Sequence, residues 1–334
     1  MRIIHYARLW TAWGLALLLN VNVGPASAGT AGSDPYPSHP VEIIVAYPAG
    51  GGTDILTRLV AERLSQVLQQ PVLVVNRGGA SGAIGTEAAA RARPDGYTLL
   101  MATSNVTISP AIDPATRFDP TRDFVPVALL SESPFVLAAN AALPVRSFDE
   151  LVEYSRGHRG EINYASTGIG SPQHLATELL CKLAGLQWVH IPYQGGAPAV
   201  ADLLAGHVQV MLSNVLPIQP YLGEDKIRPL AVTTQAPLPA LPKVPTLASQ
   251  GQPEMVIGFW TGLLAPAGTP APVIAKLEAA LLQIIDTPEI RDKLTKEGSV
   301  VRPMASRDFA GYIAQDAARW KRIAQETGIG AARR

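Results

Sequence analysis

The hydrophobic pattern of the first half of the chain alternates between strand-like and helix-like stretches. Residues 41–47 form an apolar run, which is typical of a strand buried on both faces in a parallel sheet. Thr53 is a suitable N-cap for a following helix, because apolar side chains then recur at the helical period. A strand over 72–75, another helix and a strand over 97–102 come next. This order predicts a doubly wound α/β unit whose ligand would lie at the carboxyl ends of the strands.

The second half repeats this scheme after a long extended stretch over 125–139. The stretch is interrupted at 131–134 and is interpreted as a crossover to a second lobe. Ser147 opens a helix with a capping box, and Ser171 followed by proline opens another. Further strands are expected over 162–165, 188–193, 208–212, 228–234 and 259–264, and C-terminal helices are expected to begin near residues 270, 288 and 306. We therefore expect two α/β lobes, each a sheet flanked by helices, joined by more than one crossing as in a hinged clamshell.

Glycine, serine, threonine and asparagine residues collect at the carboxyl ends of the predicted strands. Their loops lie at 49–54, 81–82, 103–105, 166–171 and 194–196. The glycines that begin at Gly50 leave no side chain between backbone and ligand, and the helix behind them presents unpaired N–H groups and a positive dipole end. None of these loops contains Lys or Arg, so the predicted ligand is a carboxylate held by N–H groups. One such seat in each lobe would let a dicarboxylate bridge the two lobes.

These loops supply the candidate ligand-binding residues. They are Tyr47, Ala49, Gly50, Gly51, Gly52, Thr53, Asp54, Ser81, Ser104, Asn105, Ser166, Thr167, Gly168, Ser171, Tyr193, Gly196 and Asn214. Turn geometry would explain any single glycine loop, whereas the whole set favours a binding site. Asp54 differs from the other candidates because it is negatively charged. Its ordinary role is to stabilise the helix dipole, and its charge would repel an anion unless water lies between them.

Composition and charge exclude several other classes of protein. The 334 residues carry 27 basic and 27 acidic side chains without a run of Lys and Arg, so nucleic acid is not expected as a partner. The nucleotide-binding glycine fingerprint fails at Gly50 and at Gly168, and the six histidines lack the spacing of zinc ligands. No catalytic residue, metal or cofactor is therefore expected. The single cysteine, Cys181, allows no internal disulfide, and we expect it to be a buried structural thiol.

The N-terminus has the pattern of an export signal. Arg2 and Arg8 lie in a short basic region, residues 9–23 are mostly apolar, and residues 26–28 have the small-x-small pattern of a signal peptidase site. We expect residues 1–28 to be removed after Ala28 and the mature protein to be soluble. An uncleaved membrane anchor is the alternative, although the apolar run is shorter than the ~20 residues that a spanning helix needs.

Segments in order along almost the whole mature chain carry a resemblance to a known family. They are residues 47–54, 76–82, 94–100, 192–198 and 260–269. Through them the chain resembles the Bug-type extracytoplasmic solute-binding receptors of the tripartite tricarboxylate transporter family. It departs from the usual pattern at Tyr47-Pro48 and at Gln194, which concerns the identity of the ligand rather than its class.

The resemblance implies a fold, a ligand and partners. The fold would be the type II periplasmic binding protein fold, with a discontinuous first lobe over 37–133 and 252–334 and a second lobe over 134–251. The ligand would be a small carboxylate, either a dicarboxylate or an aromatic acid. The protein would be a periplasmic monomer, and its partners would be the permease subunits of the transporter. One alternative is a ligand sensor that feeds a membrane signalling partner. Another is a secreted hydrolase that uses Ser81 or Ser171, because the sequence around Ser81 nearly forms a hydrolase elbow.

Overall fold

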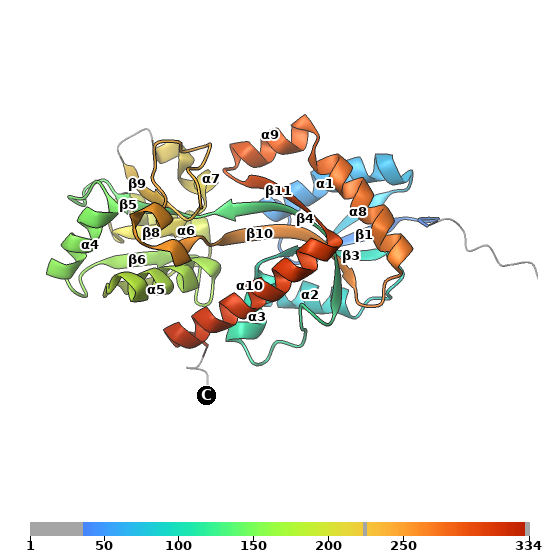
Figure 1. Cartoon of the computed structure of the whole chain (residues 1–334), viewed down its shortest axis with the longest axis horizontal. Coiled ribbons are helices and arrows are strands. Elements are labelled where there is room, and N and C mark those ends of the chain that lie inside the picture. Colours follow the sequence, from blue (N-terminus) through green and yellow to red (C-terminus); the bar gives the residue numbers. More distant parts are fainter. Residues whose placement is uncertain (1–35, 223–225, 331–334) are drawn as a thin grey trace, which may run out of the picture. The chain divides into compact units, whose positions relative to one another are not determined.

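The computed structural model describes residues 36–222 and 226–330 (Figure 1). The chain divides into two units, Met1–Tyr36 and Pro37–Arg334, and all the elements below belong to the second unit. The predicted signal peptide and its cleavage site lie outside the described residues. Among the described helices, none combines the length and the apolar character required to cross a membrane.

The first sheet has six strands in the order β11-β4-β10-β3-β1-β2. They are β1 (Val41–Val45), β2 (Val72–Asn76), β3 (Thr98–Thr103), β4 (Phe124–Pro134), β10 (Gly258–Pro266) and β11 (Val300–Ala305). β1 lies parallel to β2 and β3, as its apolar sequence predicts. β10 runs antiparallel to β3 and β4, and β11 pairs antiparallel with β4, so the sheet is mixed.

Six helices accompany this sheet. They are α1 (Gly52–Leu68), α2 (Ala83–Ala90), α3 (Asn105–Ile112), α8 (Ala271–Ile285), α9 (Pro288–Lys296) and α10 (Ser306–Thr327). The N-cap of α1 is Gly51 rather than the expected Thr53, because the extended backbone becomes helical directly after Gly51 and no side chain caps this end. α3 is a helix that the sequence pattern does not predict, since it is short, contains Pro110 and begins in a polar loop.

The second sheet has five strands in the order β7-β6-β8-β5-β9. They are β5 (Val136–Asn140), β6 (Asn163–Ser166), β7 (Val189–Pro192), β8 (Val210–Ser213) and β9 (Ile227–Val232), with helices α4 (Phe148–Gly157), α5 (Pro172–Ala184), α6 (Gly196–Ala205) and α7 (Val215–Ile218). Both predicted serine caps are confirmed. The Ser147 hydroxyl accepts a hydrogen bond from the Glu150 N–H at 3.1 Å, and the Ser171 hydroxyl accepts one from the His174 N–H at 3.2 Å.

The chain crosses between the two sheets from β4 to β5 and again from β9 to β10. The extended stretch breaks at Phe135 and not at 131–134, because β4 continues to Pro134. Thr233 joins the two crossings. Its hydroxyl accepts from the Phe135 N–H at 2.8 Å and donates to the Ile257 carbonyl at 2.6 Å. The lobe boundaries at 133/134 and 251/252 remain a proposal, which these changes of sheet support, and we use the terms first lobe and second lobe for the segments that they define.

Helix α10 contributes to the hydrophobic cores on both sides of these crossings (Figure 1). Phe309 packs in the cluster that contains residues of β1, β3 and β10. Trp320, farther along the helix, packs in the cluster that contains residues of β5, β6 and α5. An ion pair at 3.1 Å between Lys182 of α5 and Glu326 of α10 lies on the surface beside the second cluster. The helix therefore ties the two lobes together in addition to the two crossings.

Candidate functional site

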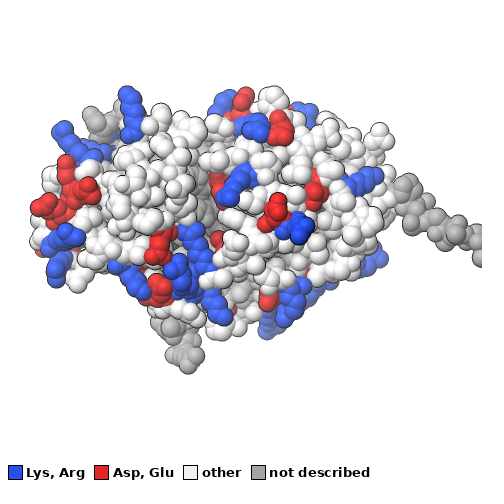
Figure 2. Space-filling model, in the orientation of Figure 1, with Lys and Arg blue, Asp and Glu red and all other residues white. Residues whose placement is uncertain are grey.

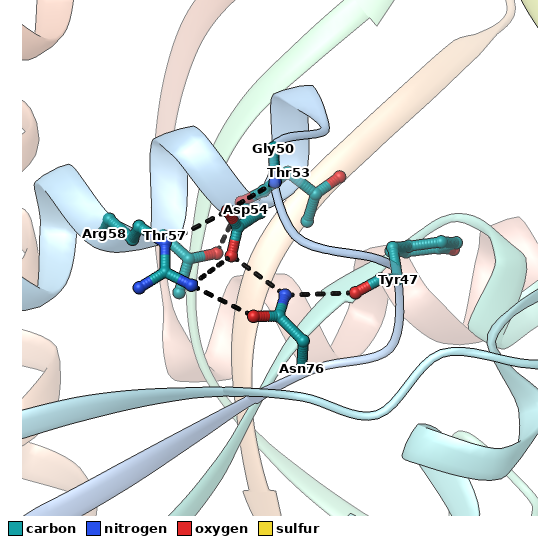
Figure 3. Close-up of polar contacts among 7 residues, drawn as sticks. All are labelled: Tyr47, Gly50, Thr53, Asp54, Thr57, Arg58 and Asn76. Carbon is teal, nitrogen blue, oxygen red and sulfur yellow. Dashed lines mark hydrogen bonds and ion pairs between the residues drawn. The ribbon is translucent and has the colours of Figure 1, made fainter.

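The loop between β1 and α1 is held in place by the buried carboxylate of Asp54 (Figure 3). This carboxylate accepts hydrogen bonds from the Gly50 N–H at 2.8 Å, from the Asn76 amide at 2.9 Å and from the Arg58 guanidinium at 3.0 Å. The Asn76 amide also donates to the carbonyl of Tyr47 at 3.1 Å. Asp54 and Asn76 together fix both ends of the glycine loop.

The same donors keep Asp54 ionised. The hydrogen bond from Arg58, followed by that from the Gly50 N–H, lowers the pKa of Asp54 to about 2. Because the guanidinium lies 3.0 Å from the carboxylate, an anion near the N-terminus of α1 would meet a charge-balanced pair. The predicted repulsion between Asp54 and an anionic ligand is therefore reduced even without an intervening water.

Tyr47 and Asn105 position the loop around Ser81 on the same wall of the first lobe. The Tyr47 hydroxyl bonds the Thr103 hydroxyl at 2.7 Å, and the Asn105 amide donates to the Ser81 carbonyl at 3.1 Å. Burial raises the pKa of Tyr47 to about 12, so its phenol stays neutral and able to donate. Ala80 and Ser81 have positive φ angles of 47° and 53°, a backbone strain that often marks functional loops.

In the second lobe, the loop that follows β6 leads into the N-terminus of α5. The Ser166 hydroxyl accepts from the Gly168 N–H at 3.1 Å and bonds the His190 ring at 2.7 Å. Gly168 and Gly170 have φ angles of +134° and +77°, which other residues adopt only with strain. Because Pro172 has no N–H and the His174 N–H bonds the Ser171 hydroxyl, the first turn of α5 presents mainly the Gln173 N–H to the cavity.

Two stacked imidazole rings support this loop. The rings of His174 and His190 are 3.8 Å apart between centroids, and the Gly170 N–H donates to Nδ1 of His174 at 3.0 Å. An Nδ1 atom that accepts a hydrogen bond carries no proton. Burial, followed by the charge of His190, lowers the pKa of His174 to about 4, so the neutral ring that holds the loop persists at neutral pH.

Both lobes contribute walls to a cavity of about 640 Å³. Residues at the N-termini of α1, α3 and α5 line it, together with hydroxyl and amide side chains from both lobes. Lys and Arg side chains mix with Asp and Glu side chains on the molecular face in Figure 2, but none of the described residues that line the cavity is Lys or Arg. Glu297 is the only charged residue in this described lining. The cavity thus offers N–H and O–H donors without a cation.

Most of the residues predicted to bind the ligand line this cavity. Those in the lining are Tyr47, Gly51, Gly52, Thr53, Ser81, Asn105, Thr167, Gly168, Ser171 and Asn214. The remaining predicted residues, Ala49, Gly50, Asp54, Ser104, Ser166, Tyr193 and Gly196, lie outside the lining. Among them, Ser104 and Ser166 are fully buried, and the Tyr193 hydroxyl donates to Asp202 at 2.6 Å. The side chains of Asp54 and Ser166 support the loops from behind, since each accepts a hydrogen bond from a loop N–H group.

Several lining residues have no counterpart in the sequence-based set. They are mainly on the crossing strands, on α3 and around α9, and they include Ile108, Ser131, Ser133, Gln173, Phe259, Thr261, Leu294, Glu297 and Ser299. The alternation of Ser131 and Ser133 along an apolar strand is the one pattern that could have indicated a polar wall. Gln173 lies just after the predicted loop at 166–171, whereas the residues of β10 and those around α9 lie far along the sequence from any glycine loop.

Two glycines mark places where elements of the two lobes approach closely. A Cβ atom on Gly298, between α9 and β11, would lie 2.3 Å from Cβ of Val215 at the start of α7. A Cβ atom on Gly170 would lie 2.4 Å from Cδ1 of Ile112 in α3. No real Cβ atom tolerates such distances, so a side chain at either position would require its neighbours to move.

Comparison with known proteins identifies the family. The model of the tripartite tricarboxylate transporter family receptor, TctC, matches residues 56–329. The chain belongs to this family. The receptor is similar to protein BugT of Bordetella pertussis, with 34% identity over 93% of this chain and 97% of that protein.

Solved structures of similar proteins agree with this assignment. Rpa4515 of R. palustris with adipate shares 32% identity and a TM-score of 0.78, and the match covers 88% of the receptor and 99% of that chain. MatC of Rhodopseudomonas palustris with bound malate shares 33% identity and a TM-score of 0.74, over 86% of the receptor and 99% of that chain. The predicted fold, a periplasmic binding protein with sheets flanked by helices, is confirmed, and both sheets are mixed.

Family membership also settles the class of activity, because this is a family of binding proteins and not of enzymes. The hydrolase alternative is therefore wrong. The geometry agrees, since the Ser171 hydroxyl caps α5 and the His190 ring bonds Ser166 instead of Ser81 or Ser171. Within the part of the receptor that the structure describes, no group of three or more His, Cys, Asp and Glu side chains is arranged to hold a metal ion.

Proposed function

We propose that the receptor captures a small organic carboxylate in the cavity between its lobes and delivers it to the membrane subunits of a tripartite transporter. The observation that carries this proposal is the convergence of the N-termini of α1, α3 and α5 on a cavity lined without Lys or Arg. Unpaired N–H groups and the positive ends of helix dipoles favour an anion there. Relatives with bound adipate and malate, both carboxylates, support the same ligand class.

The loops of the first lobe and those of the second lobe supply different parts of the proposed binding site. In the first lobe, the backbone of Gly51–Thr53 and the loop at Ser81 form one seat for a carboxylate. In the second lobe, residues 167–171 and Asn214 line the same cavity and supply further polar groups for the bound acid. Each charge-assisted hydrogen bond contributes about 1.5 to 3 kcal/mol, so two or three of them hold a carboxylate without a cation. Asp54 and Ser166, outside the lining, act by fixing these loops.

Thermal unfolding of the mature receptor with a panel of mono-, di- and aromatic carboxylates tests this proposal. At 100 times its Kd, a true ligand adds about 2.7 kcal/mol to the free energy of unfolding and raises the Tm. The matched control is the neutral amide of each acid, which lacks the charge that the helix termini attract and should not raise the Tm. The proposal fails if no acid in a broad panel stabilises the receptor, or if the amides stabilise it equally.

We further propose that the receptor works in the periplasm after removal of residues 1–28. The basic and apolar pattern of this segment and the periplasmic binding proteins among its relatives support this location. The intact mass of the exported protein should correspond to a chain that begins at Gly29. A mature chain that still begins at Met1 would contradict cleavage.

A further inference from the structure

The cavity is larger than a short diacid needs, and its charge is uneven. Its volume of about 640 Å³ lies within the range of about 300 to 1,000 Å³ that holds drug-sized ligands, so a small acid seated at the glycine loops leaves part of it free. The N-termini of α1 and α5 contribute partial positive charge to the lining. Glu297, which directly follows α9, contributes a full negative charge.

Glu297 stands where the cavity adjoins a second, outer hollow. Glu297 and Leu216 line both spaces, and the remaining lining of the outer hollow is formed by charged residues of α9. These are Glu289, Asp292, Lys293 and Lys296. Together with Glu297, the lining of the outer hollow contains three carboxylates and two ammonium groups. Arg63 of α1 forms an ion pair with Glu289, so the acidic group at the border that also lines the cavity is Glu297, in contrast to the loops that carry the helix N-termini.

The partner of Glu297 does not saturate its carboxylate. The Lys293 ammonium lies 2.9 Å from one oxygen and belongs to the preceding turn of the same helix. Both side chains of the pair are half-buried, and an ionised carboxylate has about four lone-pair sites, so the second oxygen of Glu297 can still accept a hydrogen bond. The Glu297 side chain is 18% exposed, so a ligand group beside it would meet a partly desolvated charge. A hydrogen-bond donor is favoured there, and a second carboxylate is repelled.

We infer that Glu297 is a specificity-determining residue: it selects carboxylates whose far end carries a hydroxyl, amide or ammonium group and rejects those whose far end is a carboxylate. This inference rests on the proposed capture of a carboxylate at the glycine loops and names the kind of acid that fits. The donor end of the ligand occupies the part of the cavity at Glu297, and the carboxylate end lies at the helix N-termini.

Calorimetric titration with three matched series of straight-chain acids tests this assignment. The series have the same chain lengths, from four to eight carbons, and end in a methyl group, a carboxylate, or a hydroxyl or ammonium group. At the chain length that binds most tightly, the donor-ended acid should bind the mature receptor about tenfold more tightly than the diacid. In Glu297→Gln, affinity for the diacid should rise about tenfold, while affinity for the methyl-ended acid changes less than about twofold.

Asp292→Asn is the matched control, because it removes one carboxylate from the same helix and lines only the outer hollow. It should leave the order of the three series unchanged. The inference is overturned if the diacid binds most tightly to the unmodified receptor and Glu297→Gln does not alter that preference. It is also overturned if Asp292→Asn and Glu297→Gln shift the affinities equally, since the effect would then be one of general charge. If none of these acids and no acid of the broader panel binds, the proposed function itself fails.

Discussion

Single residues act on the ligand loop of the first lobe through Asp54, whose carboxylate accepts donors from the glycine loop, from β2 and from α1. This arrangement converts a residue that would repel an anion into a support for the N–H groups that attract one. The contribution of Asp54 to the stability of the folded protein depends on the number of hydrogen-bond donors that its carboxylate accepts.

Asp54→Ala should lower the free energy of unfolding by about 2 kcal/mol at pH 7, because it leaves the Gly50 N–H and the Asn76 amide without their acceptor. Urea denaturation measures this difference. Asp308→Ala is the control, since Asp308 also lies in a helical first turn but is exposed. An equal loss in both variants would mean that the helix dipole, and not the hydrogen-bond network, accounts for the effect.

The contribution of Asp54 should also depend on pH. Its pKa is about 2 in the folded protein, below the value of about 4 in an unfolded chain. A lowered pKa contributes stability that is fully present above the unfolded pKa and disappears as the pH falls through the folded pKa. The difference between the parent and Asp54→Ala should therefore be constant above pH 5 and shrink between pH 4 and pH 2. A difference that stays constant down to pH 2 would contradict the assigned network.

The sequence permits only part of this residue-level picture. An Asp in the first turn after a glycine loop is a recognisable feature, and the resulting expectation of a binding loop agrees with the cavity lining. Its partner Asn76 lies 22 residues away and meets it only because β1 and β2 are adjacent strands. The positive φ angles at Ala80 and Ser81 have no signature in residue type, since neither is Gly or Asn.

Among the elements, the turn between α9 and β11 approaches the second lobe closely at Gly298 and Val215. Gly298→Ala should be destabilising for two reasons. Its φ of +73° is unfavourable for alanine by about 1 to 2 kcal/mol, and its Cβ would overlap Val215. Val215→Gly in the same chain removes the Cβ atom that the new side chain would overlap and should recover part of the loss, which a double-mutant cycle of urea denaturation measures as a coupling energy of about 1 kcal/mol.

Gly251→Ala separates the two reasons. Gly251 has a φ of +81°, and no atom beyond its chain neighbours lies within 4 Å of the place that a Cβ atom would occupy, so its substitution reports backbone strain alone. Gly298→Ala should lose more stability than Gly251→Ala, and Val215→Gly should not rescue Gly251→Ala. Equal losses without coupling would show that the lobes are not in tight contact at Gly298.

The sequence predicted helices whose starts are set by a local hydrogen bond, and it did not predict elements that are stabilised by packing against distant parts of the chain. Ser147 and Ser171 each satisfy an N–H of their own helix, so the two helix starts are readable from short motifs. α3 and β11 lack such motifs. α3 is stabilised by contact with α10, including the hydrogen bond at 2.6 Å from Thr107 to the buried Asp316, and β11 by pairing with β4. Both partners are distant in sequence.

For the whole molecule, the two crossings and α10 connect the lobes at separate places. Trp320 of α10 is fully buried among residues of the second lobe, whereas Phe309 is fully buried among residues of the first. A hinge motion that opens the cavity must therefore preserve the packing along α10 or expose large apolar side chains. The two-lobed architecture was predictable from the order of strands and helices. The connection through α10 was not, because an apolar stripe on a helix does not show which surfaces of the protein it packs against.

The absence of Lys and Arg from the described cavity lining has a consequence for the conditions under which the receptor works. Long-range attraction between a basic site and an anion weakens with added salt, because the screening length falls from about 10 Å at 0.1 M to about 3 Å at 1 M. Short hydrogen bonds from N–H groups inside a cavity are screened far less. The Kd for the carboxylate found in the thermal panel should therefore change less than about threefold between 0.1 M and 1 M NaCl, as measured by calorimetry. A tenfold loss would point to a cationic contact, and a constant Kd would describe a receptor that holds its ligand equally well in fresh and in saline surroundings.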